Sequence, residues 1–356
     1  MAKQARSPVT EALAAVAVPI AATLLGLLVG TIFILASGSN PVEAYAALWQ
    51  SVAGDPSQFG ETLVNAIPLI LTGLAVALAF RCGLFNIGVE GQYLVALVAS
   101  AWVGYRFALP HVLHTTLALL AGAVAGAAWA AIAGLLKAYR DVNEVITTIM
   151  LNYIALYFAH WLVMAPLRDP QALAPATPPV LPTAMLAQGL IAESRLHSGL
   201  WIALAAALLL WLFLWRTPLG YEIRAVGLSP GAAEYAGISV KRNVLLVMAL
   251  SGALAGLAGG VQTLGITGRF YEQAGFIGYG FEAIAVALVG RNHPVGTVLS
   301  ALLFAALDRG GPAMQAMAGV PMTVIAIVQG TVILFVAVEG LWNILRKRKA
   351  RAVKPA

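Results

Sequence analysis

Long apolar stretches separated by short clusters of charged residues make up most of this chain. A helix needs about 20 consecutive apolar residues to cross the hydrocarbon core of a bilayer. Seven intervals between successive charged residues are long enough for one such helix each: 11–43, 61–81, 106–137, 144–168, 195–216, 242–269 and 309–339. Three further apolar runs cover 84–105, 277–290 and 292–307, and the last two are short and rich in glycine. The pattern predicts an all-α polytopic membrane protein with about ten transmembrane segments, and it leaves open whether 277–290 and 292–307 span fully.

The composition supports this reading and excludes several other classes of protein. Sixty per cent of the residues are hydrophobic and 10% are charged, whereas soluble domains have about 45–50% apolar and 25% charged residues. The single Cys82 cannot form an internal disulfide. No polar stretch is long enough for a separate soluble domain, so we expect residues 1–356 to form one transmembrane domain.

The distribution of basic residues predicts the orientation, because cytoplasmic loops of membrane proteins carry an excess of Lys and Arg. Ten spans with a cytoplasmic N-terminus place sixteen of the 21 basic residues inside. We therefore expect both termini to be cytoplasmic. The polar stretches 37–60 and 167–198 are then external loops, and 216–242 is a cytoplasmic loop. The basic tail 346–354 directly follows the last span, which favours contact with anionic lipid over nucleic acid.

The cytoplasmic stretch 216–242 contains the pattern of a short capped helix. Ser229 is a suitable N-cap, Pro230 suits the first helical position, and Gly237 can end the helix in a left-handed conformation. Such a helix between two spans is suited to docking a cytoplasmic partner. An ordinary connecting loop is the alternative.

Two segments of the chain resemble each other. Gly88-Val89-Glu90 and the apolar run that follows it parallel Gly280-Phe281-Glu282 and its apolar run, 192 residues later. The predicted threading runs these segments in opposite directions across the membrane, as an inverted repeat requires. An inverted repeat is therefore part of the predicted fold.

Several polar residues lie in or beside apolar spans, where an ionisable group is costly. Two are carboxylates, and amides both donate and accept hydrogen bonds, as a polar uncharged solute needs. The candidate substrate-pathway residues are Asn65, Asn86, Glu90, Gln92, Asn152, Gln262 and Glu282. The alternative is that these residues stabilise contacts between helices.

No pattern for catalysis or metal binding is found in the sequence. The chain has no Walker A sequence, no G-x-S-x-G and no H-E-x-x-H. His111 and His114 are three residues apart but have no Cys or carboxylate partner nearby. We expect neither catalytic residues nor a metal site.

Three segments resemble a known family. Residues 80–100, FRCGLFNIGVEGQYLVALVAS, closely resemble the signature of permease subunits in bacterial ABC importers of the nucleoside and simple-sugar class. Residues 217–260 resemble the coupling loop and following span of that family, and 284–307 resembles a late segment. The coupling segment is shared more loosely with ribose-type and branched-chain amino-acid permeases. The similarity extends from about residue 55 to 342.

The resemblance implies a set of partners. A separate cytoplasmic ATPase would bind ATP and Mg²⁺, so this chain would need no cofactor. A second, different permease subunit would complete the translocation path, and an external solute-binding protein or lipoprotein would deliver the solute. The ATPase would dock on the helix near 229–236, and the expected coupling residues are Arg224, Gly227, Ser229, Pro230, Ala233, Glu234 and Gly237.

The resemblance also implies a function, with alternatives. The length and the form GLFNIGVEGQ are most similar to the nucleoside branch, so we expect a nucleoside importer that is not itself an enzyme. A simple-sugar permease is the first alternative. An ion-coupled secondary transporter is the second, although the capped cytoplasmic helix has no role in it. A membrane enzyme would need a catalytic constellation of His, Asp or Ser at span depth, which the sequence lacks.

Overall fold

The computed structural model describes residues 24–331 and 334–335, which fold almost entirely into helices and connecting segments. Isolated bridges, Ala176 with Tyr271 and Gln188 with His197, are the only β-type pairings in this part of the chain. The predicted all-helical class is therefore confirmed. The basic tail 346–354 and the beginning of the first predicted span lie outside the described residues.

The larger of two compact units covers residues 55–305. Its helices are α3 (Pro56–Arg81), α4 (Val89–Arg106), α5 (His111–Arg140), α6 (Glu144–Met164), α7 (Gly199–Arg216), α8 (Pro218–Leu228), α9 (Pro230–Tyr235), α10 (Val240–Gln262), α11 (Tyr279–Val289) and the first part of α12 (Pro294–Ala318). A π-helical turn, Thr263–Thr267, extends α10.

Five helices of this unit are long and apolar enough to cross a membrane: α3, α5, α6, α7 and α10 with its π-helical extension. They coincide with five of the predicted intervals. Near the C-terminus, 277–290, for which the sequence leaves full spanning open, contains the short α11. The structure differs from the prediction in α12, a 25-residue helix that joins 292–307 to the beginning of the predicted span 309–339. The total number of spans and the orientation of the termini stay predictions.

The centre of the larger unit is built on close contacts between α5 and α10. Gly122 and Gly126 of α5 face Gly252 and Gly256 of α10, so each helix contributes a Gly-x-x-x-Gly pair. A Cβ atom on Gly126 would lie 2.3 Å from the backbone oxygen of Gly252, and one on Gly256 would lie 2.2 Å from that of Gly122. Small residues at this spacing let two helix backbones touch, which maximises van der Waals contact where no water is present.

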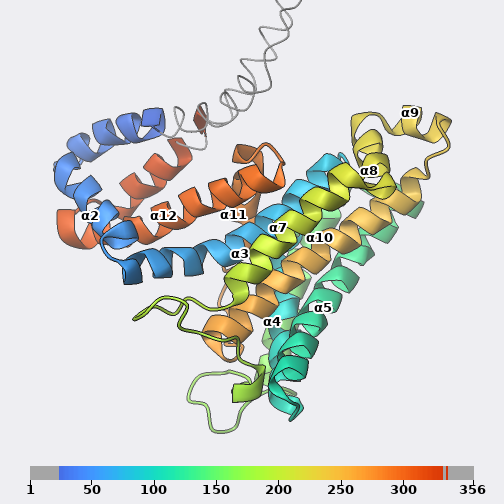
Figure 1. The fold of residues 1–356 in the computed structure, drawn as a ribbon, viewed down its shortest axis with the longest axis horizontal. Coiled ribbons are helices and arrows are strands. Elements are labelled where there is room, and N and C mark those ends of the chain that lie inside the picture. Colours follow the sequence, from blue (N-terminus) through green and yellow to red (C-terminus); the bar gives the residue numbers. More distant parts are fainter. Residues whose placement is uncertain (1–23, 332–333, 336–356) are drawn as a thin grey trace, which may run out of the picture. The chain divides into compact units, whose positions relative to one another are not determined.

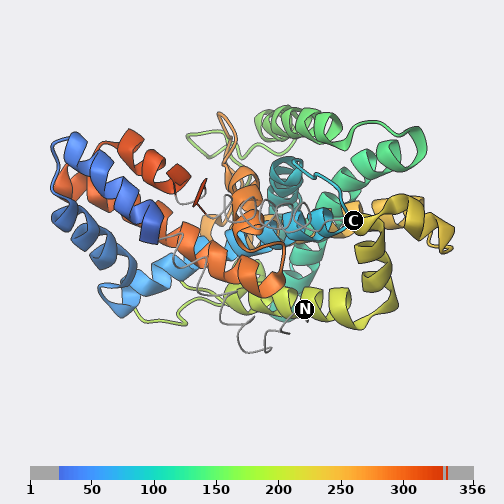
Figure 2. The same ribbon diagram turned by 90° about the horizontal axis from the view of Figure 1, so that it is seen from above.

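Two polar segments lie at opposite ends of this bundle (Figure 1). Helices α8 and α9 are at one end, and the segment 165–198 between α6 and α7 is at the other. Backbone hydrogen bonds fix the latter segment to the bundle, among them Thr177 N to Phe270 O at 2.9 Å and Leu186 N to Leu264 O at 2.9 Å. Figure 2 shows α6 and α7 along opposite sides of the unit, with the central helices between them.

The smaller unit contains the described parts of residues 1–54 and 306–356. It consists of the helix Leu24–Ala36, α2 (Pro41–Ala53), the second part of α12 and the helix Met322–Thr331. Its core contains Ile34, Ala44, Met314, Val320, Val324 and Ile325. The predicted span 309–339 is thus divided in the structure, because Gly319 takes a left-handed conformation with φ 64° and Pro321 follows it.

The prediction that 37–60 is a loop is wrong for most of this stretch, which contains α2 and the first turn of α3. Its polar residues begin helices. Asn40 caps α2 by accepting a hydrogen bond from the Val42 nitrogen at 3.0 Å, and Asp55 caps α3 by accepting one from the Gln58 nitrogen at 2.8 Å. A proline follows each cap at the first helical position, where its missing N–H costs nothing.

Candidate functional site

The Glu90 carboxylate lies where α4 and α11 begin next to each other. Glu90 is in the first turn of α4 and is fully buried. Its two oxygens accept hydrogen bonds from the backbone nitrogens of Gly278, at 2.8 Å, and Gly280, at 2.6 Å. The first N–H groups of a helix have no partner inside it, and they carry the positive end of the helix dipole. The carboxylate thus caps the N-terminus of α11.

Gly280 allows this contact. A Cβ atom at this position would lie 2.2 Å from the backbone nitrogen of Glu90. The two segments that resemble each other in sequence, around Glu90 and Glu282, therefore touch at this point. Both glutamates lie in the first turn of their helix, α4 and α11 respectively, which is compatible with the predicted inverted repeat.

Asn86 and Gln92 connect the start of α4 to α10. The Asn86 amide nitrogen donates to Gln92 Oε1 at 3.1 Å, and the Gln92 amide nitrogen donates to Asn86 Oδ1 at 3.0 Å. The Asn86 nitrogen also donates to the Ser251 hydroxyl at 2.8 Å, and that hydroxyl donates to the backbone oxygen of Ala75 at 2.7 Å. Both amides are 1% exposed, so their hydrogen-bonding capacity is directed at the protein.

Asn152 connects α6 to the same region. Its side-chain oxygen accepts a hydrogen bond from the Gly91 nitrogen at 2.8 Å, and its amide nitrogen donates to the Ile87 oxygen at 2.9 Å. The structure therefore brings together four predicted residues, Asn86, Glu90, Gln92 and Asn152, as buried polar side chains around the start of α4. Because their hydrogen bonds go to other parts of the protein, the geometry favours a role in stabilising helix contacts for these four.

The other three predicted pathway residues lie elsewhere. Asn65 is partly buried in α3, and Glu282 is partly buried in the first turn of α11. Gln262, the last residue of α10, lines a cavity of about 210 Å³. The complete lining is Tyr93, Leu97, Gln262, Thr267, Arg269, Phe270, Tyr271, Gln273 and Ile277.

This cavity, which we call the Gln262 cavity, has polar groups without protein partners. The Tyr93 hydroxyl and the Thr267 hydroxyl are buried and have no hydrogen-bond partner among the described residues. The Arg269 guanidinium lies 5.9 Å from the centre of the Tyr271 ring. Aromatic and polar groups around a cavity are typical of a site for a small polar molecule. The sequence analysis missed all of these residues except Gln262. Tyr93 and Leu97 lie among apolar residues of α4, and the others follow α10 in a segment without a recognisable motif.

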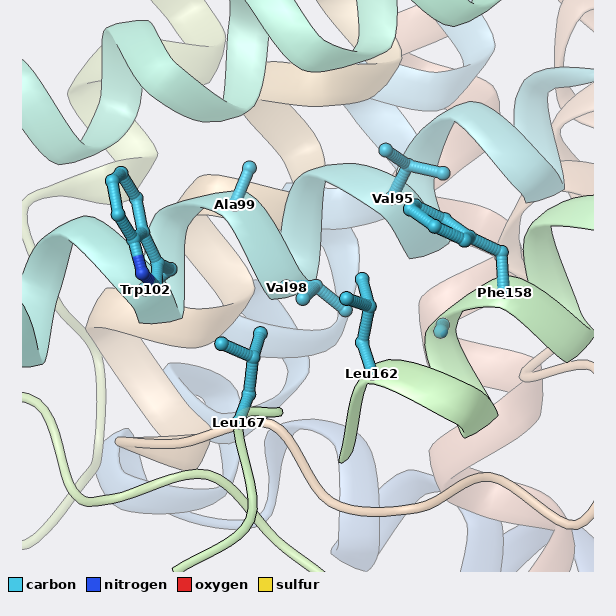
Figure 3. A pocket seen from close by; sticks show the side chains of 8 residues that line it. Val95, Val98, Ala99, Trp102, Phe158, Leu162 and Leu167 are labelled. Carbon is cyan, nitrogen blue, oxygen red and sulfur yellow. The ribbon is translucent and has the colours of Figure 1, made fainter. Parts of the chain in front are cut away.

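A second cavity, of about 280 Å³, lies between α4 and α6 and is apolar (Figure 3). Val95, Val98 and Trp102 of α4 face Phe158 and Leu162 of α6 across it. Its lining offers almost no polar surface to orient a polar solute. The Gln262 cavity is therefore the better candidate for solute contact.

The segment 217–239 forms two capped helices. Thr217 caps α8 by accepting a hydrogen bond from the Gly220 nitrogen at 3.1 Å. Ser229 caps α9 by accepting one from the Ala232 nitrogen at 3.4 Å, with Pro230 in the first helical position. Gly237 ends the segment with φ 84°. The predicted helix with its cap and stop is confirmed, and α8 is an additional helix that the sequence analysis did not separate.

The predicted coupling residues divide into buried and exposed groups. Ala233 is 4% exposed and is therefore covered by its neighbours. A Cβ on Gly227 would lie 2.1 Å from the backbone oxygen of Arg81, so Gly227 packs against the end of α3. Glu234 is exposed. Two large residues that the prediction missed, Leu228 and Tyr235, are 88% and 97% exposed. Their exposure at the end of a polar segment gives this surface an apolar component that a partner protein could cover.

Comparisons with known proteins identify relatives over most of the chain. The family described as the permease component of the branched-chain amino acid transport system matches residues 58–337. The guanosine ABC transporter permease protein NupP of Bacillus subtilis is 44% identical over 324 residues, which cover 90% of this chain and 92% of NupP. The nucleoside ABC transporter permease protein NupB of Lactococcus lactis is 40% identical over 349 residues, 95% of each chain.

A sugar permease is also among the relatives. The glucose ABC transporter permease protein of Haloferax volcanii is 39% identical over 329 residues, which cover 89% of this chain and 86% of the relative. No solved structure matches the chain.

Proposed function

Since this chain belongs to the permease family of the branched-chain amino acid transport system, we propose that it is the membrane subunit of an ATP-driven importer of nucleosides. It is a transport subunit and not an enzyme. The main support for an ATP-driven mechanism is the segment of α8 and α9, a pair of capped helices with Leu228 and Tyr235 exposed on its surface. An ion-coupled transporter working alone has no use for such a docking surface.

The nature of the solute is inferred from the relatives. Two of them carry guanosine or nucleoside in their names, and the polar and aromatic lining of the Gln262 cavity offers a stacking surface and hydrogen-bonding groups. A nucleoside needs both, because it has an aromatic base and a polyhydroxylated ribose. A sugar is the second candidate, favoured by the similarity to the glucose permease.

The proposed assembly has this chain on one side of the translocation path and a second, different permease subunit on the other. A cytoplasmic ATPase docks on α9, and a solute-binding protein or lipoprotein docks near 167–198 on the outside. Both termini are then in the cytoplasm, and ATP and Mg²⁺ bind only in the ATPase. The permease makes and breaks no bond. Its role is to take two conformations whose populations the ATP cycle of the partner shifts.

Substitutions in the coupling segment test the ATP-driven mechanism. Gly237→Pro replaces a residue with φ 84° by one restricted to about −65°, and Glu234→Arg reverses a charge on the exposed face. Tyr235→Ala removes an exposed aromatic ring. We expect each to abolish or strongly reduce both ATPase stimulation and uptake of radiolabelled guanosine in membrane vesicles.

The matched control is Tyr157→Ala, which removes a similarly exposed ring (68%) from α6, away from the segment. It should transport like the wild type. Coupling variants that retain wild-type uptake and ATPase stimulation would contradict the proposal. Competition of guanosine uptake by excess unlabelled glucose but not by adenosine would instead favour the sugar as solute.

A further inference from the structure

A second polar cavity, distinct from the Gln262 cavity, lies where three segments of the larger unit meet. It has a volume of about 290 Å³ and lies between the end of α3, the end of α8 and the turn from α11 to α12. Its lining is Phe80, Arg81, Arg224, Gly227, Leu228, Arg291 and Asn292. We call it the arginine cavity. None of these lining residues, all within the described part of the chain, is acidic.

Two of the guanidinium groups lie next to the same aromatic ring. The Arg81 guanidinium carbon lies 5.2 Å and that of Arg224 5.7 Å from the centre of the Trp215 ring. Arg81 also donates hydrogen bonds to the backbone oxygens of Asn292, at 2.7 Å, and Arg291, at 3.2 Å. Among the described residues, neither Arg81 nor Arg224 forms an ion pair. Two like charges held close to each other without a carboxylate favour an anion between them.

The turn that carries Arg291 and Asn292 gives an independent indication. Both residues have left-handed backbone conformations, with φ 55° and 52°. Asn tolerates this conformation, whereas it costs free energy in Arg291. Strain of this kind persists where the surrounding structure enforces it, often at ligand sites. The Asn292 side-chain oxygen is buried without a hydrogen-bond partner among the described residues. On rotation of its amide group, Asn292 can present a donor instead.

From these observations we propose that the arginine cavity binds the phosphate group of an anionic ligand, either a phospholipid headgroup or a free phosphate compound. Guanidinium groups match phosphate oxygens in paired hydrogen bonds. A phosphate, with three or four oxygens and up to two negative charges, can bind several of the arginines that line the cavity at once, which a carboxylate does less well. The bound group would join α3, α8 and the α11–α12 turn, so it would hold the coupling segment against the bundle. The proposal does not depend on which solute is transported.

Two variants test the site in the purified full-length chain, without transport partners. Arg224→Gln removes one guanidinium, and Arg291→Asn removes another while placing a residue that tolerates the left-handed conformation. Arg81 is left unchanged because it holds the turn. The matched control is Arg242→Gln at the exposed start of α10, outside the cavity lining. Gel filtration and circular dichroism verify that all three variants fold.

Two probes distinguish the sources of phosphate. Native mass spectrometry counts phosphatidylglycerol molecules retained after purification from mixed phosphatidylglycerol and phosphatidylcholine bilayers. Calorimetry measures AMP binding in phosphatidylcholine nanodiscs. We expect the wild type and Arg242→Gln to bind at least one probe, and Arg224→Gln and Arg291→Asn to bind it about tenfold more weakly, the equivalent of one lost charged hydrogen bond.

Each outcome has a distinct meaning. If the cavity variants lose only phosphatidylglycerol binding, the ligand is a lipid headgroup. If they lose only AMP binding, the ligand is a free phosphate compound. The proposal is overturned if the wild type binds neither probe, or if both cavity variants bind as well as Arg242→Gln. Coupling variants that transport like the wild type would contradict the proposed function but would not change these binding results. The two proposals can therefore be contradicted independently.

Discussion

At the residue scale, Glu90 illustrates how a carboxylate is accommodated inside an apolar bundle. Its position in an apolar run identifies it as unusual in the sequence, but a functional and a structural role are both compatible with that position. The deciding partners, Gly278 and Gly280, are 188 and 190 residues away. No local pattern predicts such contacts, which explains why the sequence identifies the polar residues but not their roles.

Removing the charge of Glu90 should weaken the cap on α11. The amide of Glu90→Gln has one acceptor oxygen for two N–H groups, so we expect the free energy of unfolding to fall by about 1–3 kcal/mol. Thermal unfolding in detergent, followed by intrinsic fluorescence, measures the effect. Glu193→Gln, in an exposed loop position, is the control and should leave the Tm unchanged. Equal Tm values for the two variants would argue against the cap.

His197 should make stability sensitive to acid. It is 1% exposed, its Nδ1 accepts a hydrogen bond from the Gly199 nitrogen at 3.1 Å, and burial lowers its pKa from 6.5 to about 4. The unfolded chain therefore binds a proton between these pH values that the folded chain does not. The contribution of the neutral His197 to the free energy of unfolding is fully present above pH 6.5. It is lost on acidification toward pH 4, by up to about 1.4 kcal/mol per pH unit.

The pH dependence of the Tm tests the role of His197. His197→Gln should flatten the profile between pH 4 and 6.5, whereas His111→Gln, at an exposed position, should leave its slope as in the wild type. A profile that is equally steep in all three proteins would show that other groups are responsible.

At the element scale, the contact between α5 and α10 determines how the bundle packs. The lengths of the apolar stretches alone predict both helices, with ends close to those observed. The pairing of their glycines is not predictable in the same way, because glycine is frequent throughout the chain and spacing does not indicate which helix is the partner. The polar stretch 37–60 was misassigned for a related reason: proline and Asn or Asp indicate both loops and helix starts.

Filling the α5–α10 contact should separate the helices. The side chain of Gly126→Val would enter the space occupied by the Gly252 oxygen, 2.3 Å from its Cβ, and we expect a loss of at least about 1–3 kcal/mol from overpacking. Ala128→Val places the same side chain on the exposed side of α5. If the Gly126 variant shows the same Tm and detergent stability as the Ala128 variant, the close contact is not important.

At the scale of the whole molecule, composition and charge predict a helical membrane protein with polar segments on both sides. The structure confirms the helices and places α8–α9 and 165–198 at opposite ends of the larger unit. Which end faces the cytoplasm depends on a membrane that the chain itself does not contain. The orientation therefore calls for a direct measurement.

Cysteine labelling can determine the orientation with little background. The single Cys82 is 3% exposed, and burial raises the pKa of its thiol to about 12, so it reacts slowly. A membrane-impermeant maleimide should label Leu173→Cys, at a fully exposed position of the 165–198 segment, in intact cells. It should label Ala236→Cys, next to α9, only after permeabilisation. The reverse pattern would invert the proposed topology.

The close backbone contact between α5 and α10 also has a mechanical consequence. Helix α10 begins directly after the α8–α9 segment and, with its π-helical turn, continues for 28 residues, a length of about 40 Å. Its far end carries Gln262 and Thr267 of the Gln262 cavity. Because glycine contacts join α10 to α5 along its middle, we expect the two helices to move together as one rigid body. A displacement at the α8–α9 end would then move the cavity wall at the other end by a comparable distance.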